Sequence, residues 1–231
     1  MNTELVSSPV EKLANLIIKR HSLKPGFNIE KYLATQADLM FKQIPNGVDG
    51  ISINLKSKDK RPIVIISSNL SQARQRFTMA HELGHIVIPW HIGTIFSHTD
   101  ENHAFANHLY QNCEVEANKF AAELLMPSQW VELMLNNKHP ADAFEAIRKI
   151  AGTSYIATFY KIGSKISTEY IGVLTDSQEI VISSICNNPG LRKPESNKLI
   201  KEQAIFKNAS HIRSSKCGKN YIFWLKYSKD V

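Results

Sequence analysis

Apolar and polar residues follow two periods along this chain, and each period predicts a different kind of element. Apolar residues recur at helical spacing over residues 9–21 and again over residues 28–41. Residues 48–55 alternate in part, and residues 62–67 contain an unbroken β-branched run at positions 63–66, so both are predicted strands, the second one buried. The first part of the chain is therefore expected to combine helices with a small sheet.

The middle of the chain is predicted to be helical. One helix is expected over about residues 71–88, with Ser71 as its N-cap, and another over about residues 113–126, ended by Pro127. Three shorter helices follow, over residues 129–136, 141–151 and 155–162. The last two resemble a helix-turn-helix in outline, but few basic residues line them, which favours a plain helical pair.

The C-terminal part has the pattern of a small mixed unit. Residues 169–185 are predicted to form a β-hairpin, residues 187–197 a loop, and residues 221–227 an aromatic strand. We therefore predict an α+β protein. Its first domain spans residues 1–165 and is mainly helical with a small sheet, and a small basic α+β unit spans residues 166–231.

The chemically most informative stretch is the apolar segment from Arg76 to Ile88, which contains the pattern His-Glu-x-x-His. On a helix, residues four apart share a face, so His81 and His85 can direct two imidazoles at one point. Glu82 follows the first histidine, so its carboxylate can lie close to the same point without being a metal ligand. This arrangement is typical of a zinc-activated water beside a general base. The alternative is a buried amphipathic helix with two core histidines.

A hydrolytic zinc site needs a third protein ligand, and the helix after Cys113 offers two carboxylates, Glu114 and Glu116. Small residues at helical spacing, beginning with Ala117, would let this helix pack closely against the motif helix. Glu114 lies near the edge of that packed face, whereas Glu116 lies about 200° round the helix. The spacing favours Glu114 as the ligand, with Asn118 hydrogen-bonding a ligand from behind. Ordinary solvated carboxylates are the alternative reading of both glutamates.

Two segments carry a resemblance to a known family. RFTMAHELGH (residues 76–85) and EVEANKFAAELLMP (residues 114–127) resemble the ImmA/IrrE family of zinc metallopeptidases. The resemblance is strongest over roughly residues 60–165, and nothing beyond about residue 170 contributes to it.

The resemblance implies a zincin-like fold and a role for each motif residue. His81 and His85 match the family's zinc histidines, Glu82 matches the general base, and Glu114 matches the third ligand. It also implies a narrow protein substrate, typically a helix-turn-helix transcriptional repressor.

Composition limits the classes of protein to consider. A hydrophobic content of 43% fits a globular protein, and no apolar run approaches the length of a membrane span. The N-terminus lacks the layout of a signal peptide. Three cysteines, Cys113, Cys186 and Cys217, form an odd and sparse set, which suggests a reducing cytoplasm. Cys113 as a zinc thiolate is the lesser alternative, because neighbouring helix positions diverge by about 100° and Glu114 already faces the site.

The net charge of +7 is concentrated at one end. Residues 1–185 hold 18 Lys and Arg against 18 Asp and Glu, whereas residues 186–231 hold 10 against 3. Such a segment can attract nucleic acid or an acidic protein face, although a solvated surface is the more common outcome.

A polar loop is expected after the motif helix, running through Asn107, and it carries His91, His98, His103 and His108. One of these histidines could stabilise the oxyanion or bind substrate, but each is more often a surface residue.

The sequence thus predicts a cytoplasmic zinc metallo-endopeptidase that hydrolyses a specific protein, with Glu82 catalytic and His81, His85 and Glu114 as zinc ligands. The alternative is a non-catalytic, zinc-stabilised regulatory module that binds a repressor or DNA. Glu82 argues against this alternative, because a structural zinc site has no need of that carboxylate.

Overall fold

The computed structural model describes residues 8–45, 47–98 and 108–227 and divides the chain into two compact units. Unit 1 comprises residues 1–127 with 151–153, and unit 2 comprises residues 128–150 with 154–231. The boundary that we expected after residue 165 does not coincide with this division, because the helices that follow Pro127 group with the C-terminal strands. As a boundary between independently folding domains, it stays a prediction.

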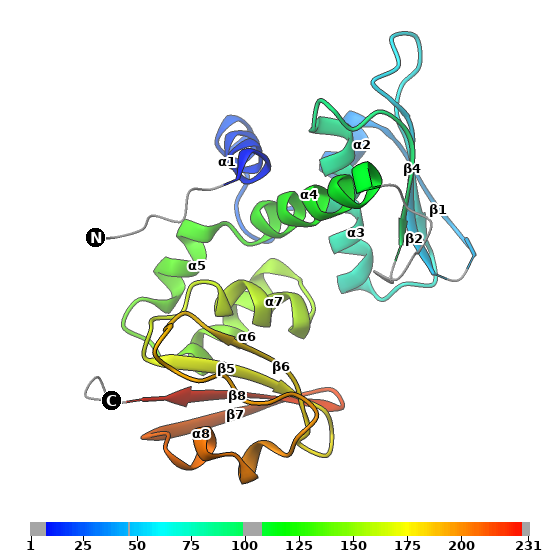
Figure 1. The fold of residues 1–231 in the computed structure, drawn as a ribbon. Helices are drawn as coiled ribbons and strands as arrows, with labels where there is room; N and C mark the ends of the chain where they lie inside the picture. The colour runs from blue at the N-terminus through cyan, green and yellow to red at the C-terminus, as the bar shows by residue number, and fades with distance from the viewer. Residues whose placement is uncertain (1–7, 46, 99–107, 228–231) are drawn as a thin grey trace. The chain divides into compact units, whose positions relative to one another are not determined.

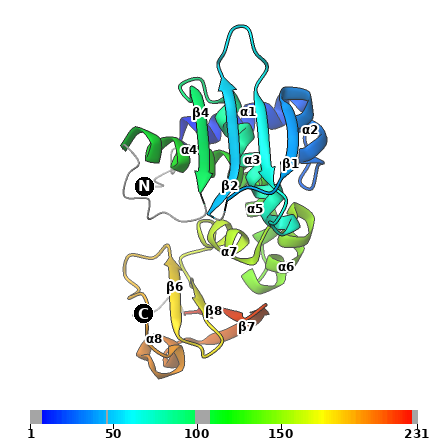
Figure 2. The ribbon, with the colours of Figure 1, turned by 90° about the vertical axis from the view of Figure 1, so that its right-hand side faces the viewer.

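Unit 1 combines a four-stranded sheet with helices on one of its faces (Figures 1 and 2). Its elements are α1 (Pro9–His21), α2 (Ile29–Gln36), β1 (Asp38–Lys42), β2 (Val48–Leu55), β3 (Ile63–Ser67), α3 (Gln72–Val87), β4 (Gly93–His98) and α4 (His108–Leu125). The strand order is β1-β3-β2-β4. Strand β1 runs parallel to β3, and the other pairs are antiparallel.

Helix α3 occupies the centre of unit 1. It packs on β2 and β3, α4 packs on α3, and α1 packs on α4. Buried apolar residues from each of these layers form one core, among them Ala14, Val64, Leu83, Phe120 and Leu124. The helix that carries the His-Glu-x-x-His motif is therefore held between the sheet and α4.

Two segments of unit 1 differ from the expectations. The helix predicted over residues 28–41 ends at Gln36, and residues 38–42 form β1, which pairs with β3. A five-residue edge strand is too short to show its period in the sequence, so the predicted helix was extended over it. Residues 93–98, expected in a polar loop, form the edge strand β4. The rest of that expected loop lies outside the described residues.

Unit 2 pairs a second four-stranded sheet with helices. Its elements are α5 (Ser128–Leu135), α6 (Pro140–Ala151), α7 (Tyr155–Gly163), β5 (Tyr170–Thr175), β6 (Val181–Cys186), the 3-10 helix η1 (Ile200–Glu202), α8 (Ala204–Lys207), β7 (His211–Cys217) and β8 (Asn220–Lys226). The strand order is β6-β5-β8-β7, antiparallel throughout. Trp224 of β8 is fully buried against Phe144 and Phe159 from α6 and α7.

The predicted α+β class is confirmed. The hairpin predicted over residues 169–185 is present as β5 and β6, and the aromatic strand is β8. Strand β7 was not predicted, because its sequence is polar and the first six of its seven residues are at least partly exposed. No helix in the described ranges is both long and apolar enough to cross a membrane.

Candidate metal centre

The site lies where α3 and α4 pack together in unit 1 (Figure 1). A Cβ atom built on Gly84 of α3 would lie 3.1 Å from Cδ1 of Phe120 and 3.3 Å from Cα of Ala117, both on α4. Small residues at positions 84 and 117 therefore let the two helices approach closely. This approach brings the α3 histidines against the carboxylate-bearing turn of α4.

Three side chains from the two helices converge on one point. Nε2 of His81 lies 3.3 Å from Oε2 of Glu114, and Nε2 of His85 lies 3.1 Å from Oε1 of Glu114. The two Nε2 atoms are 3.0 Å apart. One potential ligand atom from each residue falls within 4.8 Å of the others. The structure thus brings together the three residues that the sequence singled out as ligands.

The far side of the His81 ring is fixed by Asn118. Oδ1 of Asn118 lies 2.9 Å from Nδ1 of His81. A carbonyl oxygen can only accept a hydrogen bond, so Nδ1 donates and carries the proton of the neutral ring. Nε2 of His81 therefore presents a lone pair toward Glu114 and His85. Asn118 occupies the position behind a ligand that the sequence predicted.

The Nδ1 side of the His85 ring is fixed by two successive hydrogen bonds, through His91 to Glu116. Nε2 of His91 lies 3.1 Å from Oε2 of Glu116, and a carboxylate only accepts, so this nitrogen donates. Nδ1 of neutral His91 is then an acceptor, and it lies 2.8 Å from Nδ1 of His85, which must donate. Nε2 of His85 is consequently a second lone pair aimed at Glu114.

This donor set fits a metal ion. Two imidazole lone pairs and one carboxylate face one another with no proton assigned between them, an arrangement that a cation stabilises. Burial lowers the pKa of His85 to about 4, so this ring is neutral near pH 7. Burial raises the pKa of Glu114, but contact with the His81 and His85 rings, which stabilise the carboxylate whenever a ring carries a second proton, outweighs burial and brings the pKa to about 2.

The pKa of His81 is shifted in the opposite direction to that of His85. Burial lowers its pKa, but the hydrogen bond and the negative charge of Glu114 dominate, and the net shift is upward. A proton on His81 is itself a cation in this cluster, so a metal ion and this proton compete for the same lone pair.

Glu82 lies on the sheet side of α3 and is fully buried. Its Oε2 accepts a hydrogen bond from Oγ of Ser52 on β2, at 2.5 Å, while Oε1 has no hydrogen-bond partner among the described residues. Gly50, two residues before Ser52, makes room for this carboxylate, since a Cβ atom there would overlap Oε1 of Glu82. Burial raises the pKa of Glu82, opposed by the charge of His81 and the bond from Ser52. A cation at the His81 ring would lower it.

Other candidates from the sequence lie apart from the three converging atoms. Cys113 is a partly exposed free thiol and is not among the converging ligands. His91 is fully buried, and its ring contacts that of His85. The side chains of His98, His103 and His108 lie outside the described residues.

The sequence analysis did not identify Gly50 or Ser52, and it considered His91 and Glu116 only in other roles. One signal was available, because His91 follows the second motif histidine by six residues, just past the proline that ends α3.

A His-His-Glu cluster with an adjacent buried carboxylate, on a pair of helices beside a small sheet, defines the class of metallopeptidases. The comparisons with known proteins agree with this class. The family of IrrE N-terminal-like domains, a peptidase family, matches residues 39–166, more than half of the chain. The chain therefore belongs to this metallopeptidase family, which implies a metal cofactor.

Two relatives and one solved structure give the wider context. The chain is 31% identical over 134 residues to uncharacterized immunity region protein 2 of Bacillus phage phi105, covering 58% of this chain and 75% of that protein. It is 26% identical over 129 residues to the radiation response metalloprotease IrrE of Deinococcus deserti, covering 52% of this chain but only 45% of that protein.

The solved structure is a transcriptional regulator of Mycobacterium tuberculosis. It matches 95% of this chain and 75% of its own length, with a TM-score of 0.56 and 12% identity. At that identity the match supports the fold alone.

Proposed function

We propose that this chain is a zinc-dependent endopeptidase, with His81, His85 and Glu114 as zinc ligands and Glu82 as general base. One observation carries the proposal: one potential ligand atom from each of these three ligand residues lies within 4.8 Å of the others, beside the buried carboxylate of Glu82. Two imidazoles and a carboxylate form the ligand set of His₂Glu catalytic zinc sites, which leave one position open for water or substrate. Membership of a metallopeptidase family supports the same reading.

Zinc bound there would supply Lewis acidity to a peptide carbonyl and lower the pKa of water. The protein's own residues would handle the proton. Oε2 of Glu82 is occupied by Ser52, whereas Oε1 has no protein partner among the described residues, so Oε1 is the atom suited to take a proton from the attacking water. Glu82 would then pass this proton to the leaving amine.

The edge strand β4 offers a place for the substrate backbone. It pairs with β2 on one side and ends the sheet in the described structure. Its Ser97 is buried and lies near enough to lower the pKa of Glu82, so this strand runs past the catalytic carboxylate. We propose that an extended peptide adds to β4 as a further strand, with its scissile bond over the metal.

The proposed substrate is a helix-turn-helix transcriptional repressor. The resemblance to the ImmA/IrrE family implies this class, and the phi105 relative is named for an immunity region. A repressor encoded beside this chain's own gene is the first substrate to test.

Glu82→Gln tests the catalytic role. The variant should retain zinc, because Glu82 is not a ligand, and should cleave the repressor about 10²–10⁴-fold more slowly. The matched control is Glu30→Gln, an exposed glutamate of α2, which should cleave normally. Zinc content is measured by metal analysis and cleavage by mass spectrometry of the products. A Glu82→Gln protein that cleaves like wild type would rule out this mechanism. A zinc-loaded wild-type protein that binds the repressor without cleaving it would favour the regulatory alternative.

A further inference from the structure

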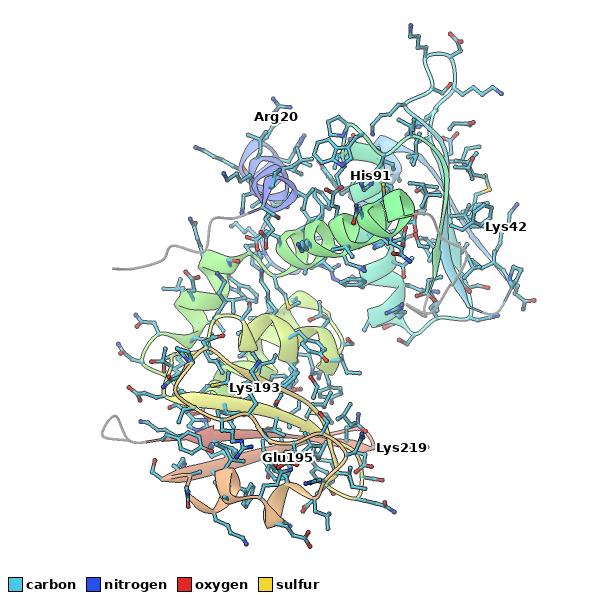
Figure 3. The ribbon with its side chains drawn as sticks, in the orientation of Figure 1. Arg20, Lys42, His91, Lys193, Glu195 and Lys219 are labelled. Atoms are coloured by element: carbon cyan, nitrogen blue, oxygen red, sulfur yellow. The ribbon has the colours of Figure 1, made fainter. Side chains whose placement is uncertain are left out.

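Behind His85 lies a group of polar side chains that the proposed mechanism does not use: His91, Glu116 and Trp90. His91, labelled in Figure 3, stands in the connection between α3 and β4 and is fully buried. Each of its ring nitrogens faces a partner, Nδ1 toward His85 and Nε2 toward Glu116. Glu116 also accepts a hydrogen bond from Nε1 of Trp90, at 2.6 Å.

We infer that His91 and Glu116 form a positioning relay for the metal site. This inference rests on the proposed zinc site and deepens it. Glu116 fixes which nitrogen of His91 carries the proton, His91 in turn fixes the proton of His85 on Nδ1, and Nε2 of His85 is left as a lone pair. The relay thereby holds one ligand in its binding-competent tautomer and ring orientation.

The direction of the two hydrogen bonds gives the relay its effect. If Glu116 were replaced by a group that donates to Nε2 of His91, Nδ1 of His91 could carry the proton instead. That proton would point at Nδ1 of His85 and favour the other His85 tautomer, with Nε2 protonated and unable to bind a metal. An acceptor at position 116 therefore sets the direction of both hydrogen bonds, and the charge of the carboxylate also increases the basicity of the ligand.

The alternative is that His91 is a core histidine with satisfied hydrogen bonds and no influence on the metal. The two roles predict different measurements. A structural role lowers the stability of the metal-free protein when His91 is replaced. A positioning role lowers zinc affinity in variants whose metal-free stability is unchanged.

The two ligand histidines have separate supports, which makes the relay testable by itself. Asn118 of α4 supports His81 directly, by accepting a single hydrogen bond from its Nδ1. His85 depends on the two-residue chain through His91 to Glu116. Loss of the relay should therefore weaken zinc binding without abolishing it, because His81 and Glu114 remain in place.

The experiment compares four single variants of the full chain. His91→Phe keeps an aromatic ring but leaves the Nδ1–H of His85 without an acceptor, and zinc affinity should fall about 10–100-fold, the range typical of outer hydrogen-bond partners. His91→Asn restores an oxygen acceptor near the position of Nδ1 and should recover most of the loss. Glu116→Gln should give a smaller loss than His91→Phe. Trp90→Phe leaves the bond from His91 to Glu116 intact and should give the smallest change.

Zinc affinity is measured by competition with a chromophoric chelator, together with the absorption spectrum of the cobalt(II) form and the thermal midpoint of the metal-free protein. A correctly folded His91→Phe protein that binds zinc as tightly as wild type overturns the relay. If that variant does not fold, Glu116→Ala decides, because alanine offers no acceptor to Nε2 of His91. The Glu116 side chain is one-third exposed, so its substitution should leave the fold intact, and unchanged zinc affinity would again overturn the relay. Wild-type protein that takes up no zinc would refute the proposed function. Failure of the relay alone would leave wild-type zinc binding intact, so the two outcomes can be distinguished.

Discussion

Both units of the chain bring two histidine rings into contact. In unit 1 the ring centroids of His81 and His85 are 4.7 Å apart, and in unit 2 those of His139 and His211 are 5.6 Å apart. Both pairs pack edge to face. Among the described residues, the first pair belongs to a cluster able to hold a metal ion, and the second does not.

The difference lies in what surrounds the rings. Nδ1 of His139 already accepts a hydrogen bond from the backbone of Ala141, at 3.2 Å, so it serves the first turn of α6. The nearby carboxylate of Asp142 is held by two hydrogen bonds from Arg213, at 2.7 and 2.6 Å. Near this pair, Nδ1 of His139 and the Asp142 carboxylate are therefore already engaged, and no metal-binding cluster forms there among the described residues.

The charges around the two pairs also differ in sign. Burial and the positive charges of Arg213, His211 and Lys226, partly offset by Asp142, lower the pKa of His139. In unit 1, Glu114 places a negative charge between its two histidines. Proximity of histidines is therefore not enough for a metal site. Each histidine must also hydrogen-bond an outer residue through one ring nitrogen, so that the lone pair of the other nitrogen faces the metal position. A carboxylate without another partner must lie at the same position.

The largest expected effect follows directly from this contrast. Glu114→Ala removes the carboxylate that joins the two histidines, so zinc affinity should fall by more than the about 10–100-fold expected for an outer partner. His139→Ala in unit 2 is the matched control and should leave zinc affinity unchanged. Both are measured by chelator competition. Equal zinc affinity of Glu114→Ala and wild type would refute the ligand assignment, and a loss in His139→Ala would place the metal elsewhere.

Two mid-strand glycines extend the comparison from ligands to packing. Gly50 of β2 faces the Glu82 carboxylate, and a Cβ atom there would also lie 2.8 Å from Cγ2 of Thr78. Gly50→Ala should displace the carboxylate, and a shift of about 1 Å can cost about 100-fold in rate. Repressor cleavage should therefore fall while zinc content, measured by metal analysis, stays near wild type. Normal cleavage by this variant would show that the position of Glu82 is not critical.

Gly172 of β5 is the matched position in unit 2. A Cβ atom there would lie 2.8 Å from Cζ3 of Trp224 and 3.0 Å from Cε2 of Phe159, within an apolar core. Gly172→Ala should destabilise the protein by about 1–3 kcal/mol through overpacking. Cleavage by the remaining folded protein should be normal. A specific loss of activity at unchanged stability would mean that unit 2 acts on the catalytic site.

The motif histidines could be placed from the sequence because helical spacing alone sets their geometry. His81, Glu82 and His85 lie on one helix. Glu114 could be preferred over Glu116 partly from its angle to the apolar face of another helix and partly from the resemblance to the ImmA/IrrE family. The structure places Glu114 at the histidines and turns Glu116 toward His91. Their roles as ligand and base remain proposals.

The supporting residues could not be found in this way. Ser52 and Gly50 come from β2, about 30 positions before the motif, and meet Glu82 only once the sheet has packed on α3. His91 looked like one of several loop histidines, and its burial depends on the turn after α3. The short strands β1 and β7 were missed for a related reason, because their pairing is decided by neighbouring strands and not by their own sequence.

The smallest expected effect concerns the basic C-terminal segment. Of its 10 Lys and Arg, at least four are paired with carboxylates in the described structure: Lys198, Lys201, Arg213 and Lys226. Deleting residues 186–231 would remove β7 and β8, including the buried Trp224, so truncation would test folding and not charge. Charge must be tested by substitution at residues that support no packing.

Lys193 and Lys219 are exposed and form no ion pair within the described part of the chain, which makes them suitable positions (Figure 3). If unit 2 attracts an acidic partner, the double variant Lys193→Gln/Lys219→Gln should raise the KM for repressor cleavage at low salt. The difference should shrink at physiological ionic strength, where screening acts within about 8 Å. Because these lysines lie in a different unit from the metal centre, kcat and zinc content should not change. The control carries the same charge change on α1, as Lys12→Gln/Lys19→Gln. If both double variants have the same salt dependence, recruitment depends on net charge and not on this surface. If neither differs from wild type at any salt concentration, the basic segment is a solvated surface with no part in recruitment.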